Sequence, residues 1–242
     1  MPLFNKVILI TGASRGIGQA CRIVCESKGG RVIPHASQAS DKTDDSFLFE
    51  DLSKAGAGER LFENALKVYG HIDAVINNAG VYLPSPLSGD GWSDGWATTM
   101  AVNVQAPADI CRSAIAHYRD RKEGVGTSKR IINIASRAGH RGDGVDHAAY
   151  AASKGAVLSM TKTWARGVSG EGIELYAIAP GWVETRMAPQ DIENRKKAVA
   201  DIPLGRVAQA EEIAHMAAFL LTGACQSAVG STFDINGASY VR

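Results

Sequence analysis

The sequence predicts an α/β fold, a doubly wound parallel sheet of about seven strands with helices on its faces. Short apolar, β-rich runs alternate with longer amphipathic stretches along the whole chain of 242 residues. Those runs are apolar throughout, which is typical of strands buried on both faces of a parallel sheet. A composition of 45% hydrophobic and 21% charged residues is that of an ordinary soluble domain with a sizeable core.

The predicted elements follow one another as strand and helix in turn. The strands are expected at Val7–Ile10, Arg31–Pro34, Phe47–Phe49, Ala74–Ile76, Arg130–Ala135, Glu174–Ile178 and Thr232–Ile235. The helices are expected, from helical periodicity, at Gly16–Lys28, Gly56–Tyr69, Ser93–Arg119, Ala148–Gly167, Gln190–Ile202 and Ala210–Leu220. No repeat, low-complexity tract or linker divides the chain, so a single domain over residues 1–242 is expected.

One connection departs from this pattern. Residues 37–46, between the second and third strands, are polar and have no helical period. A parallel crossover normally carries a helix over about a dozen residues or more. We therefore expect the helix between these two strands to be shortened to a single turn or absent.

Charge and composition argue against several classes of function. The 26 basic and 25 acidic residues leave a net charge of +1, so neither nucleic acid nor an anionic membrane is an expected partner. No apolar run reaches the ~18 residues of a membrane span. The apolar start of the chain runs directly into the first strand, which argues against a signal peptide. The four cysteines form no metal-binding pattern, and a reducing cytoplasm is the expected location.

A glycine-rich turn lies between the first strand and the first helix. It reads Thr11-Gly12-Ala13-Ser14-Arg15-Gly16-Ile17-Gly18. Glycines allow a tight turn and the close approach of a pyrophosphate, and the helix that follows offers free N–H groups and a positive dipole end to phosphate. The spacing is GxxxGxG, where the more common fingerprint is GxGxxG. Its position after a first strand indicates a Rossmann-type dinucleotide site.

Tyr150 and Lys154 lie four residues apart on a predicted helix, so their side chains stand on one face. A phenol normally titrates near pH ~10. An ammonium group beside it would favour the phenolate and lower that pKa. The spacing therefore predicts a tuned general acid or base, and the structural alternative is an ordinary helix face on the surface.

With further motifs in the same order, these residues resemble the classical short-chain dehydrogenase/reductase family over essentially the whole chain. The further motifs are Asp51-Leu52, Asn77-Asn78-Ala79-Gly80, Asn103, Ser136 and Pro180-Gly181-Trp182-Val183-Glu184-Thr185. Each motif alone could be a turn, a cap or a strand end, and the interpretation depends on their coincidence. The chain most resembles members that reduce 3-oxoacyl groups on acyl carrier protein.

The resemblance implies a role for each motif. Tyr150 would be the general acid or base, Lys154 its tuning partner and Ser136 a donor to the carbonyl oxygen. Asn103 would connect to a proton-relay water or, as the alternative, satisfy a strand end. Tyr150 and Lys154 would also contact the cofactor. The other cofactor-binding residues would be Gly12, Ser14, Arg15, Gly16, Ile17, Gly18, Ser37, Asp51, Leu52, Asn78, Ala79, Gly80, Pro180, Gly181, Val183 and Thr185. No metal is expected.

The end of the second strand bears on the choice between NADP and NAD. Folds that prefer NAD usually place an acid there to bind the ribose 2′-hydroxyl, and by resemblance Ala36 stands at that position. Arg15 could hold a 2′-phosphate through several N–H donors, with Ser37 adding a hydroxyl and His35 close by. We expect NADP(H). NAD(H) is the alternative, because a different loop path could bring Asp41 into the site.

Three loops at the carboxyl ends of strands are expected to form the substrate pocket. They are Val81–Trp92, Arg137–His147 and Glu184–Leu204. In the second loop, Arg137 or Arg141 could attract an acidic or carrier-linked substrate, the alternative being a solvated loop. Trp182 and Met187 could supply apolar walls or serve packing alone. Because fold and family do not fix a substrate, aromatic or alicyclic ketones, sugars and 3-oxoacyl thioesters all remain open.

The sequence thus predicts an oxidoreductase that transfers a hydride between NADP(H) and a small carbonyl compound or secondary alcohol. The alternatives are an NAD-dependent alcohol dehydrogenase of the same family, a nucleotide-sensing protein without catalysis, and an epimerase or dehydratase of nucleotide sugars. Retention of Tyr150, Lys154, Ser136 and Asn103 argues against the sensor, and the short chain argues against the last alternative. By resemblance, the two longest helices would pair across a subunit interface in a homotetramer or homodimer.

Overall fold

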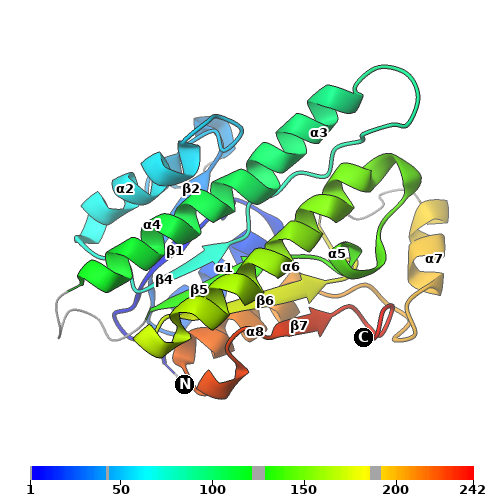
Figure 1. Cartoon of the computed structure of the whole chain (residues 1–242). Coiled ribbons are helices and arrows are strands. Elements are labelled where there is room, and N and C mark those ends of the chain that lie inside the picture. The colour runs from blue at the N-terminus through cyan, green and yellow to red at the C-terminus, as the bar shows by residue number, and fades with distance from the viewer. Residues whose placement is uncertain (1, 42–43, 122–128, 186–191) are drawn as a thin grey trace.

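The computed structural model describes residues 2–41, 44–121, 129–185 and 192–242. Its centre is a sheet of seven parallel strands in the order β3–β2–β1–β4–β5–β6–β7 (Figure 1). The strands are β1 (Val7–Ile10), β2 (Arg31–Ala36), β3 (Leu48–Phe49), β4 (Ala74–Asn77), β5 (Arg130–Ile134), β6 (Glu174–Pro180) and β7 (Thr232–Ile235). The chain moves outward from β1 to β3 and returns to β4 on the other side of β1. Ligands bind outside the carboxyl ends of the strands at such a reversal.

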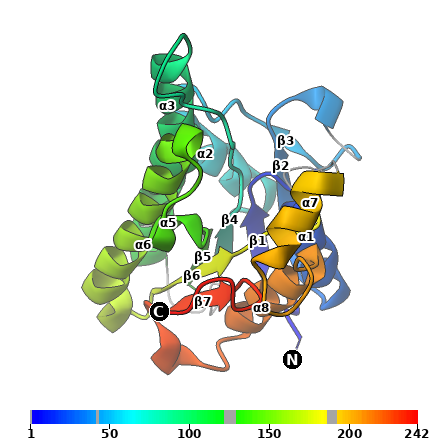
Figure 2. The same cartoon turned by 90° about the vertical axis from the view of Figure 1, so that its right-hand side faces the viewer.

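Helices cover both faces of this sheet (Figures 1 and 2). One layer consists of α1 (Gly16–Ser27) and α8 (Ala210–Thr222), and the other contains α2 (Ala57–Tyr69), α4 (Ala106–Asp120) and α6 (Ala148–Val168). Ile8 and Ile10 pack into the core under the first layer, whereas Val7 and Leu9 pack into the core under the second. Successive side chains of each strand therefore enter opposite cores, which explains the uninterrupted apolar runs.

The predicted strands are all confirmed, with bounds that agree within two residues. The described part of the connection between β2 and β3 holds only one 3₁₀ turn, η1 (Ala39–Asp41), as its polar sequence predicts. The helix expected over Gln190–Ile202 is α7, which runs from Ile192 to Ala200. The remaining short elements are α5 (Ala138–Arg141), η3 (Val145–His147), η4 (Ser169–Glu171) and η5 (Gln226–Ala228).

The helix expected over Ser93–Arg119 is confirmed, and it contains one π turn that the sequence did not indicate. A π-helical turn, η2 (Ala101–Gln105), separates α3 (Trp92–Met100) from α4. Pro107 lies in the first turn of α4 and has no N–H to donate to the carbonyl four residues earlier. The α-helical hydrogen-bond pattern is therefore incomplete at this point, and single π turns are how helices accommodate such breaks.

Both edges of the sheet are restricted. At one edge, β3 is only 2 residues long. At the other edge, Arg242 donates from Nη2 to the carbonyl oxygen of Thr232 in β7 at 2.7 Å. The Nε of Arg242 also donates to the carboxylate of Asp234 at 2.9 Å. The last residue of the chain thus occupies a backbone acceptor of the edge strand.

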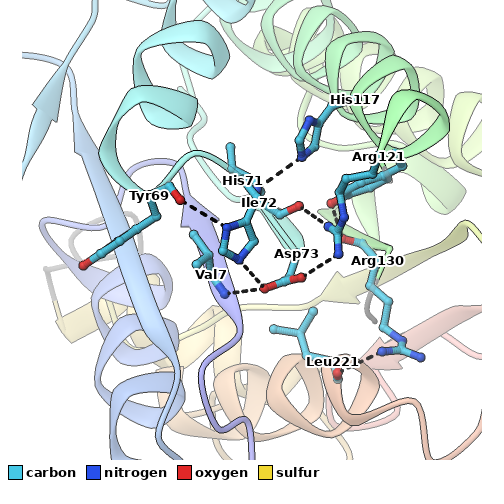
Figure 3. Close-up of polar contacts among 10 residues, drawn as sticks. Val7, Tyr69, His71, Ile72, Asp73, His117, Arg121, Arg130 and Leu221 are labelled. Atoms are coloured by element: carbon cyan, nitrogen blue, oxygen red, sulfur yellow. Dashed lines mark hydrogen bonds and ion pairs between the residues drawn. The ribbon is translucent and has the colours of Figure 1, made fainter. Parts of the chain in front are cut away.

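An ionic cluster lies at the amino ends of β1 and β4, opposite the edge where ligands are expected (Figure 3). Its centre is Asp73, which is 3% exposed. The carboxylate accepts from the N–H of Val7 at 2.8 Å and from Nη2 of Arg121 at 2.9 Å, and Nε2 of His71 lies 3.5 Å away. Arg121 also donates to the carbonyl oxygen of Ile72 at 2.8 Å. The cluster therefore ties β1, β4 and the end of α4 together.

Candidate active site

A cavity of ≈ 480 Å³ lies at the carboxyl ends of the central strands. It is lined by the glycine turn, by segments that follow β2 to β6, and by part of α6. Each predicted cofactor-binding residue lines this cavity except Gly18. Of the four predicted catalytic residues, Tyr150, Lys154 and Ser136 line the cavity, whereas Asn103 is packed behind its wall.

The glycine turn depends on glycine at three positions for two different reasons. Gly12 and Gly16 have φ angles of 63° and 55°, which favour glycine. A Cβ at Gly18 would lie 2.1 Å from the carbonyl oxygen of Gly12. Gly18 therefore allows α1 to pack against the turn.

The segment after β4 holds the glycine turn in place. Asn78 donates from Nδ2 to the carbonyl oxygens of Thr11 and Gly12, at 2.9 and 3.1 Å. Thr11 Oγ1 accepts from the backbone N–H groups of Asn78 and Ala79, both at 2.9 Å. The amide of Asn78 thus fixes the turn from behind, in addition to lining the cavity.

His35 supports the same turn from the side of β2. Its Nδ1 accepts from the N–H of Gly12 at 3.2 Å, and its Nε2 donates to the carbonyl oxygen of Glu50 at 2.9 Å. Burial lowers the pKa of His35, which keeps the ring in the neutral form that this pattern requires. With both ring nitrogens engaged, His35 positions the turn, and it also lines the cavity.

The glycine turn and the start of α1 together form a cradle that fits a dinucleotide. Helix α1 begins directly at Gly16 and has no acidic residue in its first turn, so its N–H groups and dipole favour a bound phosphate. A Cβ at Gly16 would lie 3.1 Å from Cγ2 of Thr185, and a Cβ at Gly80 would lie 3.6 Å from Nζ of Lys154. Glycine at these positions therefore keeps the narrow parts of the cavity open.

The loop after β2 brings Asp41 next to Arg15 and Ser37, which are expected to hold a 2′-phosphate. Ala36 ends β2, as predicted, and supplies no acid. Asp41 of η1 accepts from Oγ of Ser37 at 3.1 Å, and its Oδ1 lies 3.6 Å from Nη1 of Arg15. The Arg15 side chain is 58% exposed, so water screens this ion pair and makes it weak. The loop thus brings Asp41 into the cavity. This is the path that the sequence gave as the alternative, the one that would favour NAD(H).

Asp51 and Leu52 lie after β3 and line the cavity. The carboxylate of Asp51 accepts from the N–H and the hydroxyl of Ser53, at 3.0 and 2.7 Å. Hydrogen bonds from Ser53 lower the pKa of this carboxyl group. Leu52 is buried beside it, so the pair offers one polar and one apolar surface.

The cavity combines a partly buried phenol with a buried amine. Burial raises the pKa of Tyr150 to about 12, although the adjacent Ser136 hydroxyl acts in the opposite direction. Nζ of Lys154 lies 5.8 Å from the centre of the Tyr150 ring and donates to the carbonyl oxygen of Ile134 at 2.9 Å. Burial lowers the pKa of Lys154 to about 8.

The net pKa of Tyr150 is therefore raised in this arrangement, and not lowered as the spacing alone predicts. Desolvation disfavours the charged form of both groups. It acts on the phenol in one direction and on the amine in the other, so each is driven toward its neutral state. The spacing of Tyr150 and Lys154 in the sequence indicates that they are close but not that they are buried. Burial has the larger effect on both pKa values here.

Asn103 connects the end of β4 to the helix that carries Tyr150. Its Oδ1 accepts from the N–H of Val81 at 2.8 Å, and its Nδ2 donates to the carbonyl oxygen of Val81 at 2.9 Å. Nδ2 also donates to Oγ of Ser153 at 3.1 Å, and that hydroxyl donates to the carbonyl oxygen of Tyr150 at 2.7 Å. The π turn η2 presents Asn103 to these partners, and this geometry matches the alternative in which Asn103 satisfies a strand end.

An aromatic wall centred on Tyr82 borders Tyr150. The ring of Tyr82 meets that of Tyr150 edge to face, with 4.8 Å between centroids. Tyr82 also stacks on His147 at 3.9 Å and meets Trp182 at 6.5 Å. Trp182 is a wall residue that the sequence proposed, and Tyr82 lies in the loop Val81–Trp92 that was expected to form the pocket, although the sequence did not single it out.

The predicted loop Arg137–His147 is partly helical, since it contains α5 and η3. His140 stacks on Tyr240, with 5.6 Å between ring centroids, and is not part of the cavity wall. Arg137 and Arg141 both line the cavity, the first buried and the second exposed. Met187, expected as an apolar wall, lies outside the described residues.

Two further kinds of site are absent from residues 2–41, 44–121, 129–185 and 192–242. These ranges contain no group of three or more His, Cys, Asp or Glu side chains placed to hold a metal ion. None of their helices has both the length and the apolar character needed to cross a membrane.

Comparison with known proteins gives matches over nearly the whole chain. The family model described as enoyl-(acyl carrier protein) reductase matches residues 12–237. The chain is 32% identical to the 3-oxoacyl-(acyl-carrier-protein) reductase FabG of Thermotoga maritima, over 98% of each protein. It is also 33% identical to the protein FixR of Bradyrhizobium diazoefficiens, over 98% of this chain and 87% of that protein.

Solved structures show the same likeness. A blue fluorescent protein from a metagenomic library, in complex with NADPH, superposes with a TM-score of 0.89 at 29% identity, over 100% of both chains. Pseudomonas aeruginosa RhlG, in an active-site complex with NADP, superposes with a TM-score of 0.89 at 28% identity, over 99% of this chain and 98% of the other.

Proposed function

Because the chain belongs to the short-chain dehydrogenase/reductase family of oxidoreductases, we propose that it reduces a small carbonyl substrate with NADPH and that Tyr150 is its general acid. One observation supports this above all. Tyr150, Ser136 and Lys154 line the same cavity as a glycine cradle that fits a dinucleotide. The cavity therefore offers a proton donor, a second hydrogen-bond donor and a cation around one point.

In the proposed reaction, the substrate's carbonyl oxygen accepts hydrogen bonds from Tyr150 and Ser136. NADPH supplies the hydride that adds to the carbonyl carbon. Negative charge develops on the oxygen, and donors aimed at that oxygen lower the barrier. Tyr150 then gives its proton to the oxygen, and the ammonium group of Lys154 stabilises the phenolate that remains. Alcohol oxidation would use the same groups in reverse, with the phenolate as base.

The raised pKa of Tyr150 supports reduction as the favoured direction. A phenol with a pKa of about 12 is protonated at neutral pH, which is the form that a general acid needs. Oxidation of an alcohol would need the phenolate, and burial disfavours that form.

The kcat for reduction is expected to fall above about pH 8. The pKa of Lys154 is lowered to about 8, so the amine loses its positive charge as the pH rises through this value and no longer stabilises the phenolate. Below it, Tyr150 and Lys154 are both protonated and kcat should be level. A pH profile at saturating NADPH tests this. In Lys154→Arg, whose guanidinium keeps its charge, the alkaline limb should move upward, and an unmoved limb would assign the titration to another group.

NADP(H) is the cofactor that the corner after β2 supports. Ala36 leaves out the acid that usually selects NAD, and Arg15 and Ser37 can hold a 2′-phosphate. Complexes of two similar structures with NADPH or NADP point the same way. The second candidate, an NAD-dependent alcohol dehydrogenase of the same family, is favoured by Asp41, because its carboxylate competes with a 2′-phosphate for both groups.

Calorimetric titrations with NADPH and NADH separate these candidates. Arg15→Gln is expected to weaken NADPH binding about tenfold and NADH binding less than about twofold, since a charge-assisted hydrogen bond contributes about 1.5–3 kcal/mol. Asp41→Asn should strengthen NADPH binding about threefold to tenfold, because the competing carboxylate is removed. Weaker NADPH binding in Asp41→Asn, or tighter NADH than NADPH binding in the unaltered protein, would favour the NAD-dependent enzyme.

The proposed activity itself is tested by the loss of NADPH absorbance with a panel of ketones, sugars, oxo acids and 3-oxoacyl thioesters. Turnover of at least one class, abolished in Tyr150→Phe, is the expected result. Cofactor binding without any turnover across the panel would support the nucleotide-sensing alternative. A cytoplasmic homotetramer or homodimer is part of the same proposal, and sedimentation of the purified chain tests its size.

A further inference from the structure

Arg137 has a fixed place beside the proposed reaction centre. It follows Ser136 directly, and its N–H donates to the carbonyl oxygen of Pro180 in β6 at 2.9 Å. Its own carbonyl oxygen accepts from the N–H groups of His140 and Arg141, at 3.0 and 3.1 Å. The backbone is thus held between β6 and α5. Arg137 lines the cavity that contains the proposed catalytic groups, although only 5% of the residue is exposed.

The guanidinium group of Arg137 is buried with an unmade hydrogen bond. Its Nη1 has no hydrogen-bond partner, and no carboxylate of the described residues lies within ion-pair distance of it. Two other buried arginines are paired: Arg121 lies 2.9 Å from Asp73, and Arg130 lies 2.7 Å from Glu174. Buried charges in folded proteins are paired or hold a ligand. Arg137 departs from the rule that its counterparts follow, and it does so at the wall of a binding cavity.

The charged groups that face Arg137 do not supply the missing partner. Arg141 of α5 repels it, while Asp143 after α5 and Asp201 after α7 attract it from beyond ion-pair distance. All three of these residues are exposed, so water screens their effect. Burial, with a contribution from Arg141, lowers the pKa of Arg137, yet a guanidinium remains charged at neutral pH. One positive charge with planar donors is therefore left for a ligand.

We infer that the substrate is an oxo acid, whose carboxylate pairs with Arg137 while its carbonyl oxygen lies at Tyr150 and Ser136. This inference rests on the proposed function. A carboxylate has one negative charge and two coplanar oxygens, which match the guanidinium fork. A phosphate dianion would leave a second charge uncompensated. A substrate bound to a carrier as a thioester has no free carboxylate at its carboxyl carbon, so the inference separates this chain from its relatives named as 3-oxoacyl-(acyl-carrier-protein) reductases.

The test compares oxo acids with their methyl esters, which keep the reacting carbonyl and lose the charge. With the full-length protein and NADPH, kcat/KM for the best acid should exceed that for its ester at least about tenfold. Arg137→Gln should lower the value for the acid about 10- to 100-fold and change the value for the ester less than about twofold. Arg166→Gln removes the same charge from an exposed position on α6 and should preserve the preference.

The unaltered protein alone can overturn the inference, so the test remains decisive even if a variant does not fold. Equal kcat/KM for acids and esters, together with Tyr150-dependent reduction of neutral ketones, would reject the carboxylate and keep the proposed function. If no carbonyl compound is reduced, the proposed function fails, and calorimetric binding of hydroxy acids and their esters with NADP⁺ present decides the role of Arg137. Tighter binding of the acids, lost in Arg137→Gln, supports the carboxylate site, and equal binding of acids and esters rejects it.

Discussion

Tyr150→Phe is expected to lower kcat for carbonyl reduction about 10³-fold and to change the affinity for NADPH less than about twofold. The substitution removes the proton that the reduced oxygen must receive and keeps the ring that meets Tyr82 at 4.8 Å. The phenol is partly buried and its raised pKa keeps it protonated at neutral pH, and the phenyl ring of the variant offers no donor in its place. Steady-state kinetics at saturating NADPH, with calorimetric titration of the same protein samples, measures both quantities.

Two variants sharpen this result. Tyr82→Phe removes a hydroxyl from the same aromatic wall and should lower kcat less than tenfold, because that hydroxyl has no assigned part in proton transfer. Ser136→Ala should cost about 10²-fold, as loss of one donor to a developing oxyanion does. If Tyr150→Phe keeps more than about a tenth of the activity, the proton comes from another group. If it loses NADPH affinity as well, the defect lies in binding and not in the chemical step.

Asp73→Asn is expected to lower the free energy of unfolding by about 3–5 kcal/mol, because it leaves the buried guanidinium of Arg121 without its counter-charge. In thermal denaturation this corresponds to a fall in Tm of about 10 °C for a chain of this size. The cluster lies at the amino ends of the strands, far from the cavity at their carboxyl ends. The kcat/KM of the folded fraction should therefore change less than about twofold.

A double variant tests whether the lost stability comes from leaving Arg121 without its ion-pair partner. Replacing both partners of a buried ion pair by groups without charge is often close to neutral, so Asp73→Asn combined with Arg121→Met should recover much of the lost stability. Asp90→Asn makes the same chemical change at an exposed position and should lie within about 0.5 kcal/mol of the parent. Additive losses in the double variant would mean that the two side chains stabilise the fold independently.

Much of the fold could be predicted because its signals are local. The central parallel strands are short, largely apolar runs, and the polar stretch before β3 indicated a connection whose described residues hold only a single 3₁₀ turn. The break between α3 and α4 was missed because helical periodicity continues across a single π turn. Pro107 was the residue that could have revealed the break, since proline interrupts the α-helical hydrogen-bond pattern.

The candidate site was predictable where its residues lie at the ends of strands or on one face of a helix. Gly12, Ser136 and Tyr150 meet because parallel strands present their carboxyl ends at one edge of a sheet. The contacts between Asp41 and Arg15 and between Tyr82 and Tyr150 depend on loop paths that no local pattern specifies. The direction of the pKa change at Tyr150 depends on burial, which spacing along the chain does not report.

The two restricted edges of the sheet also limit how this protein can self-associate. An unpaired strand edge is a template for adding a strand from another chain, the route to domain swapping and amyloid. A β3 of 2 residues offers too short a ladder for such growth, and on β7 the guanidinium of Arg242 already occupies the outward carbonyl of Thr232. Copies of this chain are therefore expected to associate through their helical layers. The sheet is not expected to continue from one molecule into the next.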